Sequence, residues 1–339
     1  MSTIITADLH LDDNPRNSDR WNLFPWLRKQ VQKHKATHVL ILGDMTDAKN
    51  RHDAALVNRI VESITELSQF AKVIILVGNH DFVDEKSPFF AFLGRFKNVI
   101  LVKEQAEITI PDLGECLFLP CTRDYKNEWA NLEDNPAFAY IFTHQSFDGC
   151  ISENGTKLKG IPPSYFADYK GKVYSGDIHV PQKVSRNIEY VGSPYRVHFG
   201  DSFQPRCLLL GAKKATDLTY RGKPRELLVC KTLEEIKEAS FEIGSQVKIR
   251  YRLRRRDYAE WPKIRKEIKA LANRRGWELC GLQLKTIQVR SREKEASKMG
   301  STESSTLKPK EVFKEFTERK KLSKELAERG LFLLKEAQQ

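Results

Sequence analysis

Short apolar runs alternate with amphipathic segments over the first 200 residues of the chain. In the segment 54–70, Leu56, Ile60, Ile64 and Leu67 recur at helical spacing and so share one face. Buried strands alternating with helices predict a sheet covered by helices, an α/β or layered α+β domain over residues 1–211. The expected strands lie at residues 3–7, 38–42, 72–77, 98–102, 137–143, 172–175 and, as several short ones, 183–210; the other early helix lies at 23–34.

A second α/β pattern spans residues 226–290. Strands are expected at 227–230, 246–253 and 277–289, with one helix after Thr232 and another at 258–275. This succession predicts a small two-layer cap. Residues 291–310 are rich in Ser, Lys and Glu without apolar periodicity, which is typical of a linker. Residues 311–339 regain a helical pattern, so we expect a helical C-terminal tail.

The composition narrows the class of protein. With 40% hydrophobic and 30% charged residues in 339, a sizeable core is possible. No apolar run approaches the roughly 20 residues that span a bilayer, and the first residues carry Asp8 but no basic stretch. We therefore expect neither a membrane span nor a signal peptide. The six cysteines show no CxxC spacing, which excludes a zinc ribbon and indicates reduced thiols.

Positive charge is concentrated in the second part of the chain. Residues 1–200 hold 23 Lys and Arg against 25 Asp and Glu, whereas residues 201–339 hold 34 against 20. The first part is balanced like an ordinary enzyme domain, and the second suits a polyanion. This asymmetry favours a nucleic acid or another anionic surface and does not distinguish between them.

One predicted strand of the cap concentrates this charge. In residues 246–257, apolar Val247, Ile249, Tyr251 and Leu253 alternate with cations. A period of two places the apolar set inside and the cations outside, in a row that could follow a nucleic-acid backbone. The alternative is an edge strand that uses charge to avoid pairing. We expect DNA contact, mainly to phosphates, by Lys248, Arg250, Arg252, Arg254 and Arg256.

Polar stretches with metal-binding side chains follow five of the predicted strands. In α/β sheets, ligands collect at the carboxyl ends of the strands, so these stretches could converge. Carboxylate, imidazole and carboxamide groups suit manganese, iron, zinc or magnesium. Any one of these stretches alone would be typical of an ordinary loop. Five of them in succession, each at the end of a predicted strand, predict a metal centre. They are Asp8-Leu9-His10, Gly43-Asp44-Met45-Thr46-Asp47, Gly78-Asn79-His80-Asp81, Thr143-His144-Gln145 and Gly176-Asp177-Ile178-His179.

These motifs, in this order, resemble those of the calcineurin-like metallophosphoesterase superfamily over about residues 1–210. The stretch Gly176-Asp177-Ile178-His179-Val180-Pro181-Gln182 and the later Val191-Gly192-Ser193-Pro194 are similar to the SbcD branch. Phage-encoded versions look most similar, in the stretch from Ala7 to Arg16. The resemblance implies a β-sandwich flanked by helices that binds two divalent metal ions, with Mn²⁺ expected and Mg²⁺ as the alternative.

The resemblance also implies a role for each motif residue. One metal would be held by Asp8, His10, Asp44 and His179, and the other by Asp44, Asn79, His144 and Asp177, with Asp44 as the bridge. A metal-activated water would attack phosphorus in line. His80 would contact the phosphate and act as a general acid, and Asp81 would orient His80. The family usually has GHxH where this chain has Gly176-Asp177-Ile178-His179, so a carboxylate replaces one imidazole.

The SbcD branch implies a DNA nuclease subunit for repair or recombination. We expect an exonuclease with endonuclease activity on single strands or hairpins, in the cytoplasm of a bacterial or phage-infected cell. A homodimer within a heterotetramer would bind an SMC-like, SbcC-type ATPase through the C-terminal helices, unless these fold back onto the body. The alternatives are a phosphoesterase acting on a nucleotide, another small phosphoester or a phosphoprotein, and a non-catalytic DNA-binding subunit. The expected partner-binding residues are Val312, Phe313, Phe316, Leu331 and Phe332.

Overall fold

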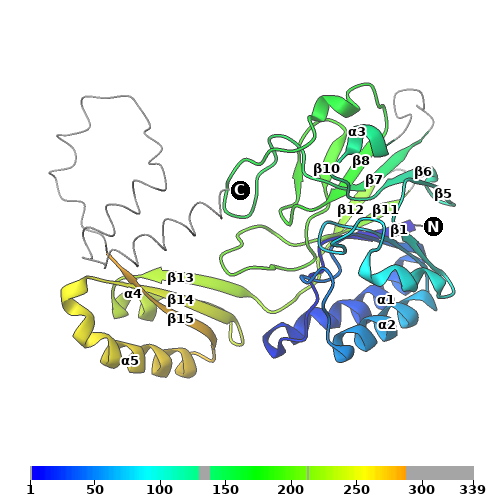
Figure 1. Ribbon diagram of the computed structural model, residues 1–339. Helices are drawn as coiled ribbons and strands as arrows, with labels where there is room; N and C mark the ends of the chain where they lie inside the picture. Colours follow the sequence, from blue (N-terminus) through cyan, green and yellow to red (C-terminus); the bar gives the residue numbers. More distant parts are fainter. Residues whose placement is uncertain (1, 130–137, 212–213, 288–339) are drawn as a thin grey trace, which may run out of the picture. The chain divides into compact units, whose positions relative to one another are not determined.

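The computed structural model describes residues 2–129, 138–211 and 214–287, which are built on three β-sheets (Figure 1). Residues 1–287 form one compact unit. The expected linker at 291–310 and the tail at 311–339 lie outside the described residues. The same holds for the expected partner-binding residues Val312, Phe313, Phe316, Leu331 and Phe332, which therefore remain a prediction.

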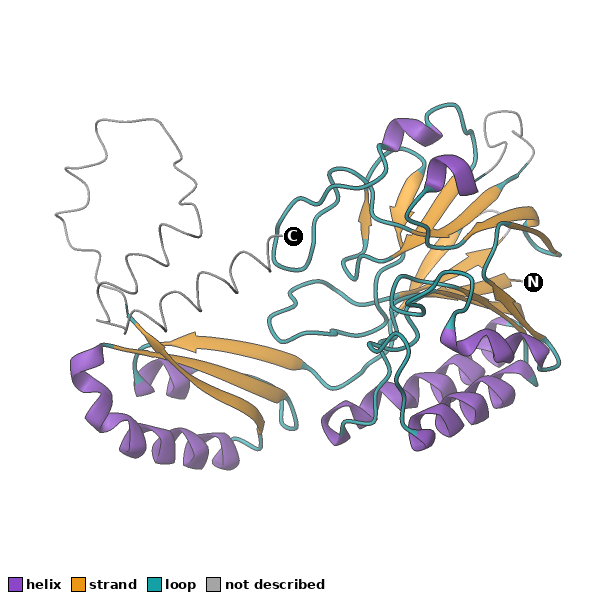
Figure 2. Cartoon of the chain, viewed as in Figure 1, coloured by secondary structure: helices purple, strands orange, loops and turns teal. Residues whose placement is uncertain are grey.

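The first sheet contains the strands that the sequence predicts most clearly. Its order is β12-β11-β1-β2-β3-β4, with β1 to β4 parallel and β11 and β12 antiparallel. Helices α1 and α2 cover the face away from the second sheet (Figure 2). The bounds are β1 Ser2–Thr6, α1 Leu23–His34, β2 Ala36–Leu42, α2 Ala54–Ser68, β3 Lys72–Leu76, β4 Val99–Val102, β11 Cys207–Gly211 and β12 Ala215–Leu218, with short 3-10 helices η1 Pro15–Asn22 and η2 Phe89–Arg95.

The strands of this sheet are apolar on both faces because each face has its own core. Successive side chains of a strand point to opposite sides. In β1, Ile4 packs with the helices and Ile5 with the second sheet; in β2, Ile41 and Leu42 divide in the same way. Burial on both faces explains why these strands read as continuous apolar runs rather than alternating ones.

The second sheet closes the sandwich and supplies further site residues. Its order is β5-β6-β7-β8-β10-β9, with β6, β7, β8 and β10 parallel. The hairpin of β5 and β6 was not expected from the sequence, because its strands are short and carry polar residues at exposed positions. The bounds are β5 Ala106–Ile110, β6 Gly114–Leu119, α3 Tyr125–Glu128, β7 Tyr140–His144, η3 Pro163–Phe166, β8 Lys172–Gly176, β9 Gln182–Lys183 and β10 Ile188–Tyr190.

The third sheet has its own apolar core and contains the basic strand. It consists of three parallel strands, β13 Arg225–Cys230, β14 Gln246–Leu253 and β15 Glu278–Thr286. Helices α4 Leu233–Glu238 and α5 Trp261–Arg274 pack on one of its faces, where Ile236 and Ile268 meet the apolar side chains of β14.

The basic row is shorter than the sequence indicated. Lys248, Arg250 and Arg252 alternate with the buried residues of β14 and so lie on the face opposite α4 and α5. The strand ends at Leu253, and the 3-10 helix η4 Arg255–Glu260 follows at once. The expectation that the row continues through Arg254 and Arg256 is therefore corrected, because the turn takes both residues off the strand.

The architecture is mixed α/β, with two large mixed sheets flanked by helices, as the sequence predicted. All six cysteines lie in the described part of the chain and are free. Within residues 2–129, 138–211 and 214–287, no helix has both the length and the apolar character needed to cross a bilayer. For the site, the important feature is that β1, β2 and β3 are parallel in the first sheet and β7 and β8 in the second. Contacts of His144 with Leu42 and of Asp177 with Asp8 show that the carboxyl ends of both sets meet.

Candidate metal centre

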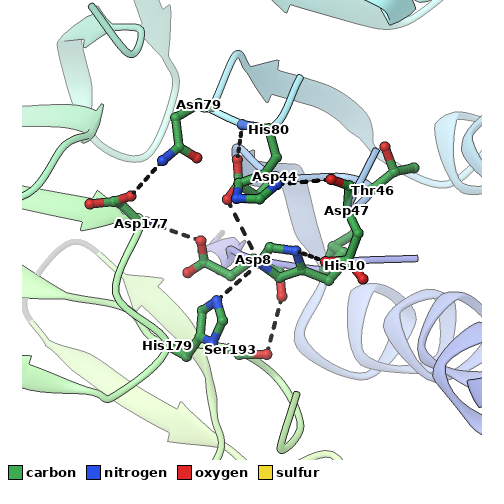
Figure 3. A network of polar contacts seen from close by, with 12 residues as sticks. Asp8, His10, Asp44, Thr46, Asp47, Asn79, His80, Asp177, His179 and Ser193 are labelled. Atoms are coloured by element: carbon green, nitrogen blue, oxygen red, sulfur yellow. Dashed lines mark hydrogen bonds and ion pairs between the residues drawn. The ribbon is translucent and has the colours of Figure 1, made fainter. Parts of the chain in front are cut away.

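The five polar motifs meet at the carboxyl ends of these strands (Figure 3). Residues far apart in the sequence thereby come into contact, as with His10 and His179, which are 169 positions apart. Asp8 and His10 follow β1, Asp44 and Asp47 follow β2, Asn79 and His80 follow β3, His144 ends β7, and Asp177 and His179 follow β8.

One half of the centre consists of Asp8, His10 and His179. Their ligand atoms lie within 4.8 Å of one another, and all three residues are buried. The Nε2 atoms of His10 and His179 face each other at 2.9 Å, and Asp8 Oδ2 is buried without a hydrogen-bond partner. Buried lone pairs that converge in this way suit a divalent cation, so the residues present fit a metal ion at this position.

The other half consists of Asp8, Asp44 and His144, again with ligand atoms within 4.8 Å. His144 is fully buried, and its Nδ1 lies 2.7 Å from the carbonyl oxygen of Leu42. Because Nδ1–H donates to that carbonyl, Nε2 is the ring nitrogen that faces Asp44 Oδ1, at 3.3 Å. In the neutral ring the lone pair of Nε2 converges with those of the carboxylate, so this half also fits a metal ion.

Asp44 lies between the two halves. Its Oδ1 faces His144 Nε2, while its Oδ2 is 3.7 Å from His10 Nε2. One carboxylate oxygen therefore points to each half, which is the arrangement that a bridging ligand requires.

Asp177 lies beside Asn79 at the edge of the second half. The Asn79 side-chain amide donates to Asp177 Oδ1 at 3.1 Å, and Asp177 Oδ1 is 3.8 Å from His144 Nε2. The Ser146 hydroxyl bonds to the other oxygen, Asp177 Oδ2. Asn79 Oδ1 is buried without a hydrogen-bond partner. The structure thus brings the carboxylate that replaces the usual imidazole to the same side of the centre as His144 and Asn79.

Glycine is required where the strand ends approach His144. A Cβ added to Gly43 would lie 2.2 Å from His144 Nδ1, and one added to Gly176 would lie 2.2 Å from the carbonyl oxygen of Leu42. Gly43 also has a positive φ of 83°. The glycines that precede Asp44 and Asp177 therefore allow β2, β7 and β8 to converge on this imidazole.

Four residues of the centre have left-handed backbone conformations. Their φ angles are 55° for Asp8, 42° for His10, 55° for Asp44 and 82° for Asp177. Such angles are uncommon for residues other than glycine and cost roughly 1–3 kcal/mol each. Backbone strain concentrated at one place is typical of a site shaped for binding or catalysis.

Burial and mutual charge shift the pKa values of this cluster. Burial raises the pKa of Asp8. Burial also acts to raise the pKa of Asp44, but His144 outweighs it and holds that pKa below its usual range. For His144, burial acts to lower the pKa, yet Asp44 raises it well above the usual value. The pKa of His179 is raised to about 9, because Glu153 and Asp8 outweigh burial.

His80 lies at the rim of the centre, half-buried. The ring Nδ1 of His80 is 2.9 Å from the backbone carbonyl oxygen of Asp47. The backbone N–H of His80 donates to Asp44 Oδ1 at 2.9 Å. The Asp47 carboxylate places Oδ1 2.6 Å from His10 Nδ1, and the ligand atoms of His10, Asp47 and His80 lie within 4.8 Å of one another. A single residue, Asp47, thus contacts the imidazoles of both His10 and His80.

Asp81 does not orient His80, and that expectation is corrected. Its buried carboxylate accepts hydrogen bonds from the backbone N–H groups of Gly78 at 2.7 Å, Asp44 at 2.9 Å and Met45 at 3.0 Å. Burial, together with the charge of Asp44, raises the pKa of Asp81 to about 6. Asp81 therefore ties together the loops after β2 and β3, and the ring of His80 is held by Asp47 instead.

Four residues that contact the centre were given no role from the sequence. Two of them could have been found from sequence motifs, because Asp47 is the last residue of the GDxxD motif and Ser193 lies in the stretch Val191–Pro194. The Ser193 hydroxyl donates to the carbonyl oxygen of Asp8 at 3.1 Å. Ser146 and Glu153 carried no such signal, because only the folding of the chain after β7 brings them to Asp177 and His179.

The chain belongs to the calcineurin-like phosphoesterase family, whose model matches residues 1–191. This family hydrolyses phosphoester bonds with divalent metal ions, and the match covers all the expected metal ligands, from Asp8 to His179. Residues 214–287 lie beyond the matched part.

Viral proteins are among its relatives. The chain is 25% identical over 188 residues to exonuclease subunit 1 of Enterobacteria phage T4, covering 52% of each protein. It is 27% identical over 183 residues to protein 078R of Invertebrate iridescent virus 3, which is provisionally named a phosphoesterase; 51% of this chain and 52% of that protein are covered. The chain thus spans about half the length of these curated relatives.

Solved structures with a similar arrangement have low sequence identity. GAP50, the anchor in the inner membrane complex of Plasmodium, shares 11% identity at a TM-score of 0.42, with 70% of this chain and 93% of that chain covered. The nuclease MPE of Pseudomonas putida shares 12% identity at a TM-score of 0.34, with 64% and 87% covered. A dimetal phosphatase from Danio rerio shares 11% at 0.34, with 65% and 99% covered.

Proposed function

We propose that the protein is a metal-dependent DNA nuclease, an SbcD-like exonuclease subunit that also cuts single strands or hairpins. The observation that carries the proposal is a pair of metal-binding constellations that share Asp8, with Asp44 of the second only 3.7 Å from His10 of the first. The choice of DNA as the substrate is supported by the basic face of β14 and by the likeness to exonuclease subunit 1 of phage T4.

We assign two divalent metal ions to this centre, most suitably Mn²⁺. Asp8, His10, Asp44 and His179 would hold one, and Asp44, Asn79, His144 and Asp177 the other. When bound, the ions supply the Lewis acidity that lowers the pKa of water and neutralises charge on the phosphoryl group. The second set offers oxygen atoms from three of its four residues, which favours a hard ion such as Mn²⁺ or Mg²⁺ over Zn²⁺.

His80 is the residue that we assign to proton transfer. Because its Nδ1 is held by the carbonyl oxygen of Asp47, Nδ1 carries a proton and the ring is fixed. When the imidazole is also protonated on Nε2, that N–H can contact a phosphate oxygen and then give its proton to the leaving oxygen. Its half-buried place at the rim is consistent with access to a polymer.

Lys248, Arg250 and Arg252 would contact DNA phosphates from the third sheet. All three lie on the face without helices, and Arg252 is exposed. Phosphate contacts of this kind give little sequence selectivity and strong salt dependence. The same proposal divides the chain into a nuclease domain at residues 1–211 and a cap domain at residues 226–290.

The remaining assignments rest on the resemblance to the SbcD branch. They are an SMC-like ATPase partner bound through the tail, a homodimer within a heterotetramer, a role in DNA repair or recombination, and the cytoplasm of a bacterial or phage-infected cell. The T4 relative is named as a subunit, which is consistent with a partner chain.

The test is hydrolysis of labelled linear duplex, single-stranded and hairpin DNA with Mn²⁺ or Mg²⁺, beside a small chromogenic phosphodiester. Wild type is compared with Asp44→Ala and His80→Ala. We expect Mn²⁺-dependent DNA cleavage that is lost in Asp44→Ala. His80→Ala should be slowed by about 10²–10⁴-fold while still binding metal, because its ring is not in the ligand set.

Two outcomes would contradict the proposal. Cleavage of the chromogenic ester alone would indicate a phosphoesterase for small substrates. A non-catalytic DNA-binding subunit would hydrolyse none of the substrates. It would bind DNA tightly but would show no Mn²⁺ binding by isothermal titration calorimetry.

A further inference from the structure

A polar hairpin after β7 lies against the segment that contains Asp177 and His179. It spans residues 146–161 and is closed by backbone hydrogen bonds from Asp148 to Ile161, from Gly149 to Leu158 and from Leu158 to Cys150. Gly160 N–H also donates to Asp148 Oδ1 at 2.8 Å. These bonds fix the hairpin on itself, so its side chains are presented from a defined backbone.

Three contacts join this hairpin to the segment 176–182. The Ser146 hydroxyl bonds to Asp177 Oδ2, as described above. The Gln182 side chain accepts from Ile151 N–H at 2.8 Å and donates to the Ile151 carbonyl oxygen at 2.7 Å. In the third contact, Glu153 Oε1 lies 2.9 Å from Nδ1 of His179, which lies between Asp177 and Gln182 in the sequence. The pair of bonds at Gln182 thus holds the hairpin where Glu153 reaches the imidazole.

We propose that Glu153 is a positioning residue that fixes the ring orientation and tautomer of His179. With Nδ1–H directed at Glu153, His179 presents the lone pair of Nε2 to the space that it shares with His10 and Asp8. Histidines that bind metals commonly donate their other N–H to a carboxylate, and losing that partner weakens metal binding about 10–100-fold. This inference rests on the proposed role of His179 as a metal ligand.

The surroundings of His179 favour Glu153 over Asp201, a nearby acidic residue outside the expected ligand set. Asp201 accepts from the backbone N–H of His198 at 2.8 Å, and the His198 ring lies 5.6 Å from that of His179 between ring centroids. Asp201 is therefore engaged with the neighbouring loop. The Glu153 side chain is only 24% exposed, so its contact with His179 Nδ1 is partly shielded from solvent and salt.

The experiment compares Glu153→Ala and Glu153→Gln in the full chain. Glu115→Gln, on an exposed position of β6, is the matched control, and His179→Ala tests the underlying ligand. Mn²⁺ affinity is measured by isothermal titration calorimetry. Hydrolysis of the chromogenic phosphodiester is measured at limiting and saturating Mn²⁺, and the melting temperature is measured in a chelator.

We expect Glu153→Ala to bind one Mn²⁺ about 10–100-fold more weakly and to regain activity at saturating Mn²⁺. Glu153→Gln should lose less, because its amide oxygen can still accept from Nδ1–H. The metal-free melting temperature should be unchanged in both variants, and Glu115→Gln should match wild type throughout.

Two results would overturn the inference while leaving the proposed function intact. The first is wild-type Mn²⁺ affinity in Glu153→Ala when His179→Ala has lost one ion. The second is a lower melting temperature in the chelator with a loss of activity that saturating Mn²⁺ does not restore, since this would mark a structural role. If His179→Ala itself binds two ions like wild type, the ligand assignment fails, and the role of Glu153 fails with it.

Discussion

The carboxylate of Asp81 accepts a hydrogen bond from the backbone N–H of Asp44 at 2.9 Å. The bond joins the loop after β3 to the loop after β2, and it orients the residue that lies between the two halves of the metal centre. The neighbouring N–H groups of Gly78 and Met45 donate to the same carboxylate. Asp81 thus acts on the backbone of the site rather than on His80.

This role predicts a large stability loss for Asp81→Ala. Three buried N–H groups would lose their acceptor, at roughly 1–3 kcal/mol each, so we expect destabilisation of at least about 3 kcal/mol. The free energy of unfolding from urea titration measures the effect. His80→Ala, which removes only a rim side chain, is the control. A variant as stable as wild type but catalytically weak would instead support an action of Asp81 through His80.

Asp177 distinguishes this chain from the usual GHxH motif of its family. Its carboxylate lies with Asn79 and His144, so we expect Asp177→His to keep Mn²⁺-dependent hydrolysis and Asp177→Ala to lose about 90% of it or more. Metal content by mass spectrometry and rates on the chromogenic ester measure both effects. Full activity and two bound ions in Asp177→Ala would remove Asp177 from the ligand set.

The basic face of β14 predicts a salt-dependent contribution to DNA binding. Replacing Arg250 and Arg252 together by alanine should weaken binding to all sequences. It should also lower the slope of log affinity against log salt by about 2, since each phosphate contact contributes roughly 0.9. The control removes Arg265 and Lys266 from α5, on the opposite side of the sheet. Equal losses in the two variants would indicate a diffuse charge effect, without a binding face on β14.

His38 predicts part of the pH dependence of stability. Burial, with the nearby Lys72, lowers the pKa of His38, and Asp112 only partly opposes this. A folded-state pKa below the unfolded one means that the unfolded chain binds the proton more readily. The contribution of His38 is therefore favourable above pH 6.5 and is lost as the pH falls.

The pH effect is measured by urea unfolding of wild type and His38→Gln at pH 5, 6 and 7. We expect the stability of wild type to fall more steeply toward pH 5 than that of the variant, because glutamine does not titrate. Parallel curves over this range would show that His38 has the same pKa in the folded and unfolded states.

The sequence by itself determined the parallel strands, the covering helices and the motif residues. Apolar runs such as the one ending at Leu42 are continuous because both faces of the sheet are buried, and this signal is local. The motif spacing likewise indicated a metal centre, since polar residues at the carboxyl ends of parallel strands must converge. The hairpin of β5 and β6 was not predicted, because its strands are short and partly polar and so show little regular alternation of apolar and polar residues.

Only the tertiary structure decided which partner each side chain has. Asp81 follows His80 directly and Asp47 is 33 positions away, yet the fold directs the Asp81 carboxylate to backbone N–H groups and the Asp47 carbonyl to the imidazole. Glu153 reaches His179 because the hairpin that carries it is held by Gln182. Such contacts depend on loop geometry between distant segments, and no periodicity or composition of the chain encodes them locally.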